Sequence, residues 1–400
     1  MSSPSSGVTA KIPDIQTFLR RENLAGWLIY DFHGLNAVAR EIAPPSAFHI
    51  TRRWFYFIPA QGEPVLLAHK IEEKNFPALP GQTQLYAGLQ EMRDRLQALL
   101  PIGRPLAMEY SPMNDVPTVS YVDAGMLELL RSFGAQIVTS AQLIQEFQAR
   151  WSEAQLQTHV AAAKILHEAQ AQAFEMIAAA LRANRQIDEY EVQQFIVQKF
   201  ADGDCLSDAA PIVAVNANAS NPHYAPTDKA HSPIRKGDVI LIDLWAKKKS
   251  PGAVFADITW MGYAGQQIPA RVQEVFNVVK TGRDRGVEFL RAKSAAKETV
   301  HGYQVDEAVR GYITAAGYGQ YFVHRTGHSL GMLTHDNGVN IDSYETHDTR
   351  AITPGVAFSI EPGIYLPDFG IRCEINVYMG AAGPEIHTPP QQEMTVLQLD

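Results

Sequence analysis

The chain has 400 residues, which is enough for two or three domains and too many for a small scaffold held together by disulfide bonds. Hydrophobic residues make up 46% of the chain and charged residues 19%, so ordinary buried cores can form. The 34 Lys and Arg against 43 Asp and Glu give a formal net charge of −9, which argues against nucleic-acid binding, because phosphate binding needs clustered cations.

The apolar segments and the cysteines indicate a cytoplasmic globular protein. The first residues lack the apolar region of a secretory signal, and no stretch approaches the ~18 consecutive apolar residues of a membrane span. The chain has two cysteines, and Cys373 lies in an apolar run, as a small core side chain does. We therefore expect no contact with a membrane and no disulfide bond at Cys373.

Residues 1–150 are predicted to form an α/β domain. Short apolar strand candidates alternate there with helical stretches at 89–100 and 124–132, a pattern typical of an α/β layer. The strand candidates are 27–30, 54–58, 65–68, 106–110 and 137–140. Ser152 and Gln155 then have the spacing of a capping box that opens a long helix, so we place the domain boundary just before Ser152.

Residues 151–400 are predicted to form an α+β domain with an internal duplication. A first helix begins near Ser152 and a second at Asp188, and a β-hairpin follows them. The same series recurs with a helix after Pro269, a helix at Asp306 and a second hairpin. The matching helices are offset by about 117 residues, and a constant offset between matching elements indicates a duplicated fold.

Each hairpin carries two acidic residues within apolar strand sequence. The hairpins span 239–260 and 356–379. A turn centred on Ser250 would place Asp243 and Asp257 of the first hairpin directly opposite each other on one face. In the second hairpin, Glu361 and Glu374 come out approximately opposite each other.

Four carboxylates gathered in one place are costly unless positive charge compensates them. Arg372 can offset one of the four at most, so divalent cations are the economical explanation. The alternative is that all four acids lie on exposed hairpins in water, which is the usual fate of a single acidic residue. Matched positions in a repeat favour the cation site.

A loop after the second pair of helices supplies a nitrogen ligand, His328. Gly327 and Gly331 flank it and favour a loop over a helix. One histidine beside four carboxylates makes an oxygen-rich site, suited to Mn²⁺ or another borderline-hard ion, and two such ions would activate water for attack on a carbonyl. His223 and His335 follow other loops and are candidates for stabilising an oxyanion or protonating a leaving amine.

This ordered set resembles the pita-bread metallopeptidases, the family of prolidase, aminopeptidase P, methionine aminopeptidase and creatinase. The resemblance covers about residues 151–400 and rests on Asp243, Asp257, Gly327-His328, Glu361-Pro362-Gly363 and residues 370–374. Residues 1–150 resemble, in size and pattern only, the N-terminal domain of the creatinase and prolidase branch.

The resemblance implies a role for each matching residue. Asp243 would hold one metal ion, and Asp257 and Glu374 would bridge two. The second ion would be held by His328 and Glu361, and Glu361 would also shuttle a proton. His223 and His335 resemble the family's substrate-contacting and transition-state-stabilising histidines. The implied substrate-binding and supporting residues are His324, Arg372 and Tyr365.

Two bulky residues depart from the family pattern. Trp245 stands two residues after the first aspartate, where Gly is common, and Trp260 stands where an Arg usually follows Asp-x-Thr. The turn between the aspartates is about three residues longer than usual and carries three lysines, residues 247–249. We expect the tryptophans and the lysines to close the cleft around a short substrate with a free carboxylate.

The function that the resemblance implies is hydrolysis of the bond preceding proline in Xaa-Pro dipeptides by a homodimer with two divalent ions. Mn²⁺ is the first choice of metal, and Co²⁺ or Zn²⁺ are alternatives. The alternative enzyme is an Xaa-Pro aminopeptidase (aminopeptidase P) that acts on longer peptides. A non-catalytic peptide-binding module of the same fold is the third possibility, and it would bind no metal tightly.

Overall fold

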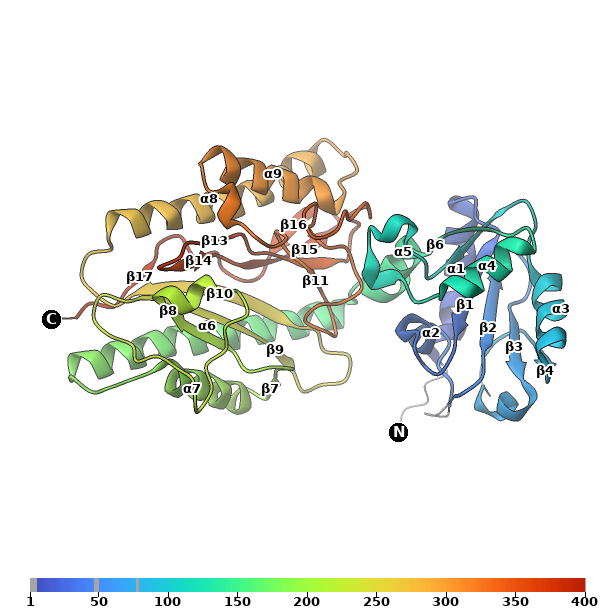
Figure 1. Ribbon diagram of the computed structural model, residues 1–400, viewed down its shortest axis with the longest axis horizontal. Coiled ribbons are helices and arrows are strands. Elements are labelled where there is room, and N and C mark those ends of the chain that lie inside the picture. The colour runs from blue at the N-terminus through green and yellow to red at the C-terminus, as the bar shows by residue number, and fades with distance from the viewer. Residues whose placement is uncertain (1–5, 47–49, 77–78, 400) are drawn as a thin grey trace. The chain divides into compact units, whose positions relative to one another are not determined.

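The computed structural model describes residues 6–46, 50–76 and 79–399 (Figure 1). The chain divides into two compact units, residues 1–148 and 149–400. Within the described residues, none of the helices combines the length and the apolar character needed to cross a membrane.

The first unit is a six-stranded mixed sheet between two layers of helices. Its strands are β1 (Gly26–Asp31), β2 (Trp54–Pro59), β3 (Val65–His69), β4 (Gln82–Tyr86), β5 (Pro105–Met108) and β6 (Gln136–Thr139), in the order β4-β3-β2-β1-β5-β6. Its helices are α1 (Ser6–Arg21), α2 (Ala37–Ile42), α3 (Leu89–Leu99), α4 (Ala124–Ser132) and α5 (Ala141–Ile144).

Both faces of this first sheet are buried, because alternate residues of its strands enter two different cores. Trp27 and Ile29 of β1 pack with α1 and α2, whereas Leu28 and Tyr30 pack with α3 and α4. The five predicted strands and both predicted helices are confirmed. Strand β4 was missed because its sequence, Gln-Thr-Gln-Leu-Tyr, begins with three polar residues, and only Tyr86 at its end is buried.

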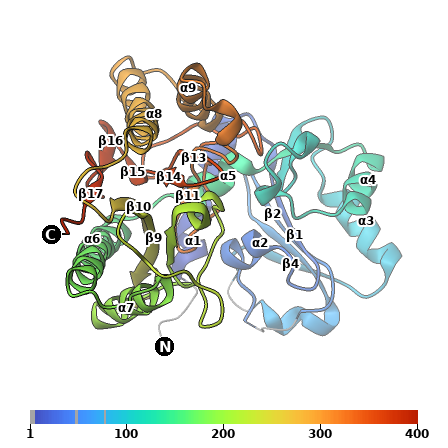
Figure 2. The same ribbon diagram turned by 60° about the vertical axis from the view of Figure 1, so that its left-hand side comes forward.

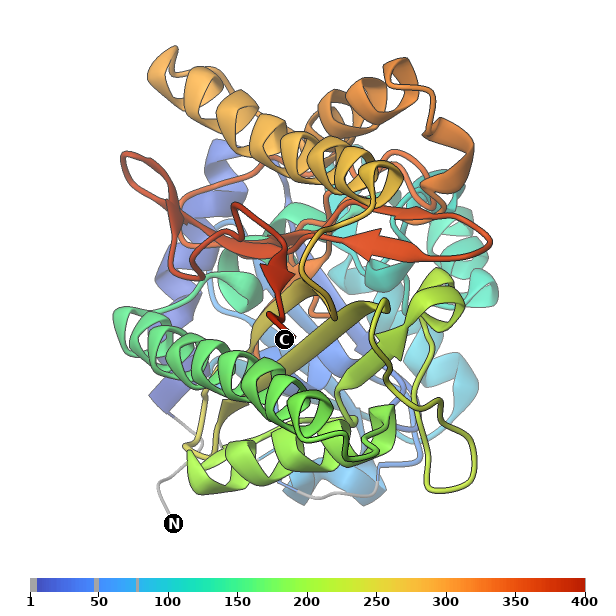
Figure 3. The same cartoon turned by 90° about the vertical axis from the view of Figure 1, so that its left-hand side faces the viewer.

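The second unit places its sheets between two pairs of helices (Figure 2 and Figure 3). The long helices are α6 (Glu153–Arg182), α7 (Glu189–Asp202), α8 (Ala270–Ala295) and α9 (Gly302–Ala315). One sheet has the order β17-β10-β9-β7 with β8 also paired to β9, another has the order β11-β12-β15-β16, and β13 pairs with β14. Helices α6 and α7 cover the sheet that contains β9 and β10, and α8 and α9 pack over the strands of the second hairpin.

The strands of the second unit are mostly short. They are β7 (Cys205–Leu206), β8 (Ile212–Val215), β9 (Val239–Lys248), β10 (Ala256–Tyr263), β11 (Ser329–Leu330), β12 (Ala357–Ile360), β13 (Gly363–Tyr365), β14 (Gly370–Arg372), β15 (Ile375–Gly380), β16 (Gly383–Ile386) and β17 (Thr395–Val396). Cys205 and Cys373 are both buried and unbridged, so the prediction of a core thiol at Cys373 is confirmed.

Three of the four predicted helix starts are confirmed, and one is wrong. Ser152 caps α6 with the predicted capping box, Asp188 caps α7, and Pro269 precedes α8. Helix α9, however, begins at Gly302, four residues before Asp306. Asp306 is fully buried inside the helix, where its carboxylate pairs with Arg310, so an acid that resembles a cap serves a tertiary contact instead.

The register of the first hairpin differs from the prediction by two residues. In the β9–β10 ladder, Asp243 lies opposite Thr259, and Asp257 lies opposite Trp245. The turn was centred one residue too early, because a long Lys-rich connection does not fix its own midpoint as a tight turn does. A shift of two residues preserves the alternation of side chains, so the two aspartates remain on one face as diagonal neighbours.

The second hairpin is interrupted at its acidic residues. Strands β12 and β15 pair in the same register as β13 and β14. Between the two ladders, this register places Glu361 opposite Glu374, as predicted. The interruption frees both side chains from the sheet at one point, which is where they meet the first hairpin.

Candidate metal centre

The two hairpins converge on a cavity of about 540 Å³ in the second unit. Nine of the ten predicted site residues line this cavity: His223, Asp243, Asp257, His324, His328, His335, Glu361, Arg372 and Glu374. The tenth, Tyr365, lies directly behind it, with its hydroxyl 2.7 Å from His324 Nε2 and 3.0 Å from Arg372 Nη1.

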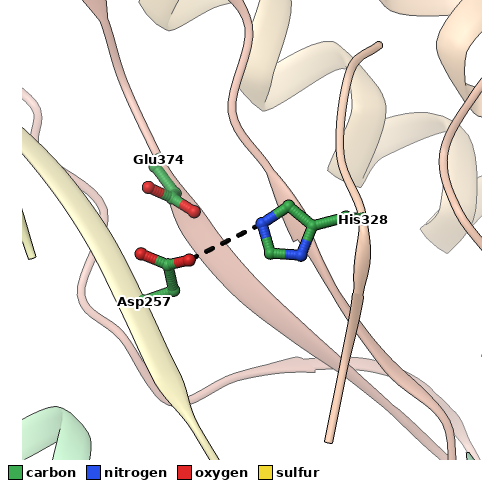
Figure 4. Close-up of side chains that lie close together, drawn as sticks. All are labelled: Asp257, His328 and Glu374. Atoms are coloured by element: carbon green, nitrogen blue, oxygen red, sulfur yellow. Dashed lines mark ion pairs between the residues drawn. The ribbon is translucent and has the colours of Figure 1, made fainter. Parts of the chain in front are cut away.

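The tightest cluster consists of Asp257, His328 and Glu374. Each offers one ligand atom, and the three atoms lie within 4.8 Å of one another. Figure 4 shows the two carboxylates side by side, with the imidazole of His328 pointing toward them from a different segment. His328 Nε2 lies 3.6 Å from Asp257 Oδ2 and 3.2 Å from Glu361 Oε1, so Glu361 adjoins the cluster.

Hydrogen bonds between the hairpins hold the carboxylates together. The Thr259 hydroxyl donates to Glu374 Oε2 at 2.8 Å, and the Glu374 N–H donates to the Thr259 carbonyl at 3.4 Å. The Asp257 N–H donates to Asn376 Oδ1 at 2.8 Å. These contacts were invisible in the sequence, because they join residues more than a hundred positions apart.

The loop before β11 presents His328 through a position that only glycine fits. A Cβ on Gly327 would lie 1.9 Å from the Ser359 carbonyl oxygen. The His328 N–H donates to Ser359 Oγ at 2.9 Å, and the Ser359 hydroxyl donates to Glu361 Oε1 at 2.9 Å. His328 Nδ1 donates to the Ser329 carbonyl at 3.2 Å, which leaves Nε2 to face the carboxylates.

Asp243 is set apart from the cluster by Arg372. The guanidinium of Arg372 forms an ion pair with Asp243 Oδ2 and donates to Thr259 Oγ1 at 3.1 Å and to the Tyr365 hydroxyl. The Tyr365 hydroxyl then bonds His324 Nε2. Arg372 therefore pairs with one of the four acids, in agreement with the prediction that it could offset one at most.

The protein does not supply enough positive charge to keep all of the remaining acids ionised. Burial raises the pKa of Asp257 to about 7, with a further contribution from Asp243, and burial together with Asp257 raises the pKa of Glu374 well above its usual value. Burial lowers the pKa of His328, but hydrogen bonds to Asp257 and Glu361 outweigh it and raise the pKa to about 10. His328 in turn holds the pKa of Glu361 below its usual range, although burial acts to raise it.

Two carboxylate oxygens show that the site fits a metal. Asp257 Oδ1 and Glu374 Oε1 are buried and have no hydrogen-bond partner in the described part of the chain. A buried carboxylate oxygen without a partner is costly. A divalent cation would satisfy both oxygens, and the donor set of carboxylates with one imidazole is one that such cations accept.

His335 and His223 also line the cavity. The His335 ring packs edge-on against the His328 ring, with 4.2 Å between centroids. Burial, reinforced by the charge of His328, lowers the pKa of His335 to about 4, so its imidazole is neutral. His223 is exposed in the loop that follows β8, and its N–H donates to Asn221 Oδ1 at 3.1 Å.

The predicted closure of the cleft is only partly correct. Trp245 lines the cavity, but Trp260 does not, because it alternates to the opposite face of β10 and packs against the α6–α7 core. The lysines at 247–249 do not line it either. Lys247 Nζ donates to the Met332 carbonyl at 2.6 Å, and Lys248 Nζ donates to the Gly203 carbonyl.

Arg325 supplies the positive charge in the cavity that was expected from the lysines. It lines the cavity, and within the described residues its side chain has no hydrogen-bond or ion-pair partner. Its backbone N–H donates to Glu345 Oε1 at 2.8 Å. Arg325 was not among the predicted site residues, although its position in sequence between His324 and His328 was a signal that could have identified it.

The sequence model of metallopeptidase family M24 matches residues 161–381, more than half of the chain. The chain belongs to metallopeptidase family M24. Membership of M24 implies a divalent metal, for which the Asp257–His328–Glu374 cluster offers ligands.

Curated relatives of this M24 chain include peptidases with and without an assigned activity. It is 32% identical over 188 residues to an uncharacterized peptidase, YqhT, of Bacillus subtilis, and 30% identical over 187 residues to an Xaa-Pro dipeptidase of Lactobacillus delbrueckii subsp. lactis. Each match covers 46% of this chain, and 48% and 46% of the two relatives, about half their length.

Solved structures of M24-type peptidases share the fold over nearly the whole chain. The dipeptidase PepE from Mycobacterium ulcerans has a TM-score of 0.72 at 20% identity and covers 99% of both chains. A prolidase from Thermococcus sibiricus has a TM-score of 0.63 at 22% identity, over 97% of this chain and 99% of that one. Escherichia coli aminopeptidase P has a TM-score of 0.56 at 16% identity, over 95% and 94%. The predicted fold class, an α/β domain followed by an α+β pita-bread domain, is confirmed.

Proposed function

We propose that this M24 chain is an Xaa-Pro dipeptidase that depends on two divalent cations. The observation that carries the proposal is a pair of buried oxygens, Asp257 Oδ1 and Glu374 Oε1, beside His328 in a cavity of about 540 Å³; neither oxygen has a hydrogen-bond partner among the residues that the structure describes. The relative from Lactobacillus delbrueckii, named Xaa-Pro dipeptidase, supports the choice of substrate class.

The five acidic and imidazole residues of the cavity would hold the cations. Asp243 would bind one, His328 and Glu361 the other, and Asp257 and Glu374 both. When bound, two divalent cations activate a water molecule and polarise the scissile carbonyl. Mn²⁺ suits this oxygen-rich set best, and Co²⁺ and Zn²⁺ are the alternatives.

The chain's own groups would handle the protons and the developing charge. Glu361 Oε1 accepts a hydrogen bond from Ser359 Oγ, and the same carboxylate would take a proton from the attacking water and return it to the leaving amine. The neutral His335 would donate a hydrogen bond to the oxyanion, and His223 would contact the substrate from the opposite loop.

The supporting residues form one continuous chain of hydrogen bonds. Arg372 donates to the Tyr365 hydroxyl, and Tyr365 donates to His324 Nε2, whose Nδ1 donates to the Arg325 carbonyl at 2.6 Å. Burial raises the pKa of Tyr365 to about 12, which keeps the hydroxyl protonated. These linked hydrogen bonds would hold the His324 side of the cavity rigid around the proline ring.

Arg325 favours a dipeptide over a longer peptide. A dipeptide carries a free carboxylate one residue beyond the scissile bond. The Arg325 guanidinium, which has no partner among the described residues, lies in the same cavity and offers a charge-assisted partner for that carboxylate. A longer peptide presents an uncharged amide at that point. The fold does not separate the two activities, because prolidase and aminopeptidase P structures both share it.

The test compares three substrates with the full chain, stripped of metal and reloaded with Mn²⁺. We expect Ala-Pro to be hydrolysed with much higher kcat/KM than Ala-Pro-Ala, and Ala-Ala to be a poor substrate. Comparable values for Ala-Pro and Ala-Pro-Ala would favour aminopeptidase P. No hydrolysis and no bound metal would favour the peptide-binding module. The proposal also includes a homodimer, which light scattering on the same sample checks.

A further inference from the structure

One exposed carboxylate joins two walls of the cavity. Asp208 lies between β7 and β8, outside the cavity, and its Oδ1 accepts a hydrogen bond from Trp245 Nε1 at 2.7 Å. Its Oδ2 accepts one from Thr334 Oγ1 at 3.0 Å. Trp245 and Thr334 both line the cavity, and Thr334 directly precedes His335.

The position of Trp245 places its ring beside the metal centre. Trp245 is the cross-strand partner of Asp257 in the β9–β10 ladder, so the two side chains leave the sheet on one face about 5 Å apart at Cβ. An indole is among the largest side chains, and here it is half-buried against the cavity. A small residue at this position would leave that volume to the substrate.

The loop that carries His335 is fastened to the same hairpin at two further points. The Gly331 carbonyl accepts a hydrogen bond from the Phe255 N–H at 2.9 Å, and the Met332 carbonyl accepts one from Lys247 Nζ. Both of these bonds hold the start of the loop. The bond from Thr334 to Asp208 holds its far part, next to His335.

We propose that Asp208 is a positioning residue that sets the size of the substrate through Trp245 and the placement of His335 through Thr334. This inference rests on the proposed function. Because proline is common to all Xaa-Pro substrates, the size limit that Trp245 imposes falls on the side chain of Xaa. The enzyme therefore favours small Xaa residues, and Asp208 makes that preference sharp by holding the ring in one orientation.

The test measures kcat and KM for Gly-Pro, Ala-Pro, Leu-Pro and Phe-Pro on the Mn²⁺-loaded full chain. Trp245→Ala should raise kcat/KM for Phe-Pro relative to Ala-Pro by ~10-fold or more. Asp208→Ala should shift the same ratio in the same direction by about 3-fold and lower kcat for every substrate, since the ring and the His335 loop both lose their anchor.

Asp208→Asn provides the decisive comparison. Its amide oxygen still accepts from Trp245 and its amide nitrogen can donate to Thr334 Oγ1, so the wild-type preference and kcat should return to within about 2-fold. Asp228→Ala, an exposed aspartate of the same unit outside the cavity, and Trp260→Phe, on the opposite face of the β9–β10 sheet, are the matched controls and should keep the wild-type profile.

The possible outcomes separate the inference from the function beneath it. An unchanged Phe-Pro to Ala-Pro ratio in both Trp245→Ala and Asp208→Ala, with wild-type metal content, would overturn the role of Asp208 while the dipeptidase stands. Equal changes in kcat and in the Phe-Pro to Ala-Pro ratio for Asp208→Asn and Asp208→Ala would also overturn this role. A wild type that cleaves none of the four dipeptides would overturn the proposed function and this inference together.

Discussion

Glu361 and Glu374 lie opposite each other across the gap in the second hairpin, and their environments push their pKa values in opposite directions. His328 holds the pKa of Glu361 below its usual range, whereas burial and the charge of Asp257 raise the pKa of Glu374 well above it. Opposed shifts in neighbouring carboxylates are typical of groups with different chemical roles. In the metal-free chain these shifts favour the ionised form of Glu361 and the protonated form of Glu374, so a cation would be needed to keep Glu374 ionised.

Replacement of Glu374 by Gln should remove metal binding and leave the fold intact. The amide has the shape of the carboxylate but loses its charge, so the affinity for Mn²⁺ should fall ~100-fold or more and Ala-Pro hydrolysis should be lost. Without metal, the variant should be at least as stable as the wild type, because it removes a buried acid whose Oε1 has no partner in the described ranges of the chain. Thermal unfolding with and without Mn²⁺ measures both effects.

The wild type serves as the reference for that experiment, since Mn²⁺ should raise its Tm. A Glu374→Gln enzyme that keeps two metal ions and near-normal turnover would contradict the assignment of Glu374 as a bridging ligand.

Replacement of His335 by Ala should lower the rate without releasing metal. His335 contacts the ring of His328 but is placed to bind the developing oxyanion, a contact worth ~10²–10³ in kcat. KM for Ala-Pro should change little, because the contact forms in the transition state. Metal analysis beside steady-state kinetics distinguishes this role from that of a ligand: a variant that loses metal would show His335 to be part of the metal site.

Replacement of Arg325 by Ala should raise KM for Ala-Pro by ~10- to 100-fold, because a charge-assisted contact with the substrate carboxylate is lost. Hydrolysis of Ala-Pro amide, which has no carboxylate, should be unaffected. Arg325→Lys keeps the charge and should recover part of the loss. If Ala-Pro and its amide suffer equally in Arg325→Ala, the side chain supports the cavity wall and does not bind the carboxylate.

His159 should make the second unit less stable in mild acid. It is almost fully buried, its Nδ1 donates to the Phe255 carbonyl at 2.9 Å, and burial lowers its pKa from 6.5 to about 4. The folded pKa lies below the unfolded one, so the stabilising contribution is complete above about pH 6.5 and is lost as the pH falls toward 4. The full loss amounts to about 3 kcal/mol.

His159→Asn isolates this contribution, since its amide nitrogen can replace Nδ1 as the donor and does not titrate. Urea unfolding of metal-free protein between pH 7.5 and 4.5 should show a shallower loss of stability in the variant than in the wild type. Parallel pH profiles for the two proteins would contradict the proton linkage assigned to His159.

The sequence located the acids of the site because a carboxylate inside an apolar strand is conspicuous on its own. It could not fix the register of the first hairpin, because a long Lys-rich turn leaves its midpoint open. The face of Trp260 could have been predicted from the sequence: Asp257 and Thr259 lie on the face of β10 toward the site, so Trp260, the residue after Thr259, points to the opposite face. This alternation is stronger evidence for the position of Trp260 than its closeness to Asp257 in sequence, on which the prediction that it closes the cleft was based.

Other features depended on contacts that no local pattern records. Asp208 reaches Trp245 and Thr334 across the fold from a polar loop whose composition gives no hint of it. Asp306 resembles a helix cap in sequence, but its carboxylate accepts from Thr326 and Arg310 inside the core. In both cases a tertiary partner, unknown at the level of sequence, decides the role of an ordinary aspartate.

The most direct test of the central claim is a titration of metal-free full chain with Mn²⁺, following bound metal and Ala-Pro hydrolysis in the same samples. The account predicts that two ions bind per chain and that the rate rises with their occupancy, reaching its plateau when the second site fills. Hydrolysis of Ala-Pro at the full rate without bound metal would contradict this account. Two bound ions with no hydrolysis of Ala-Pro would also contradict it.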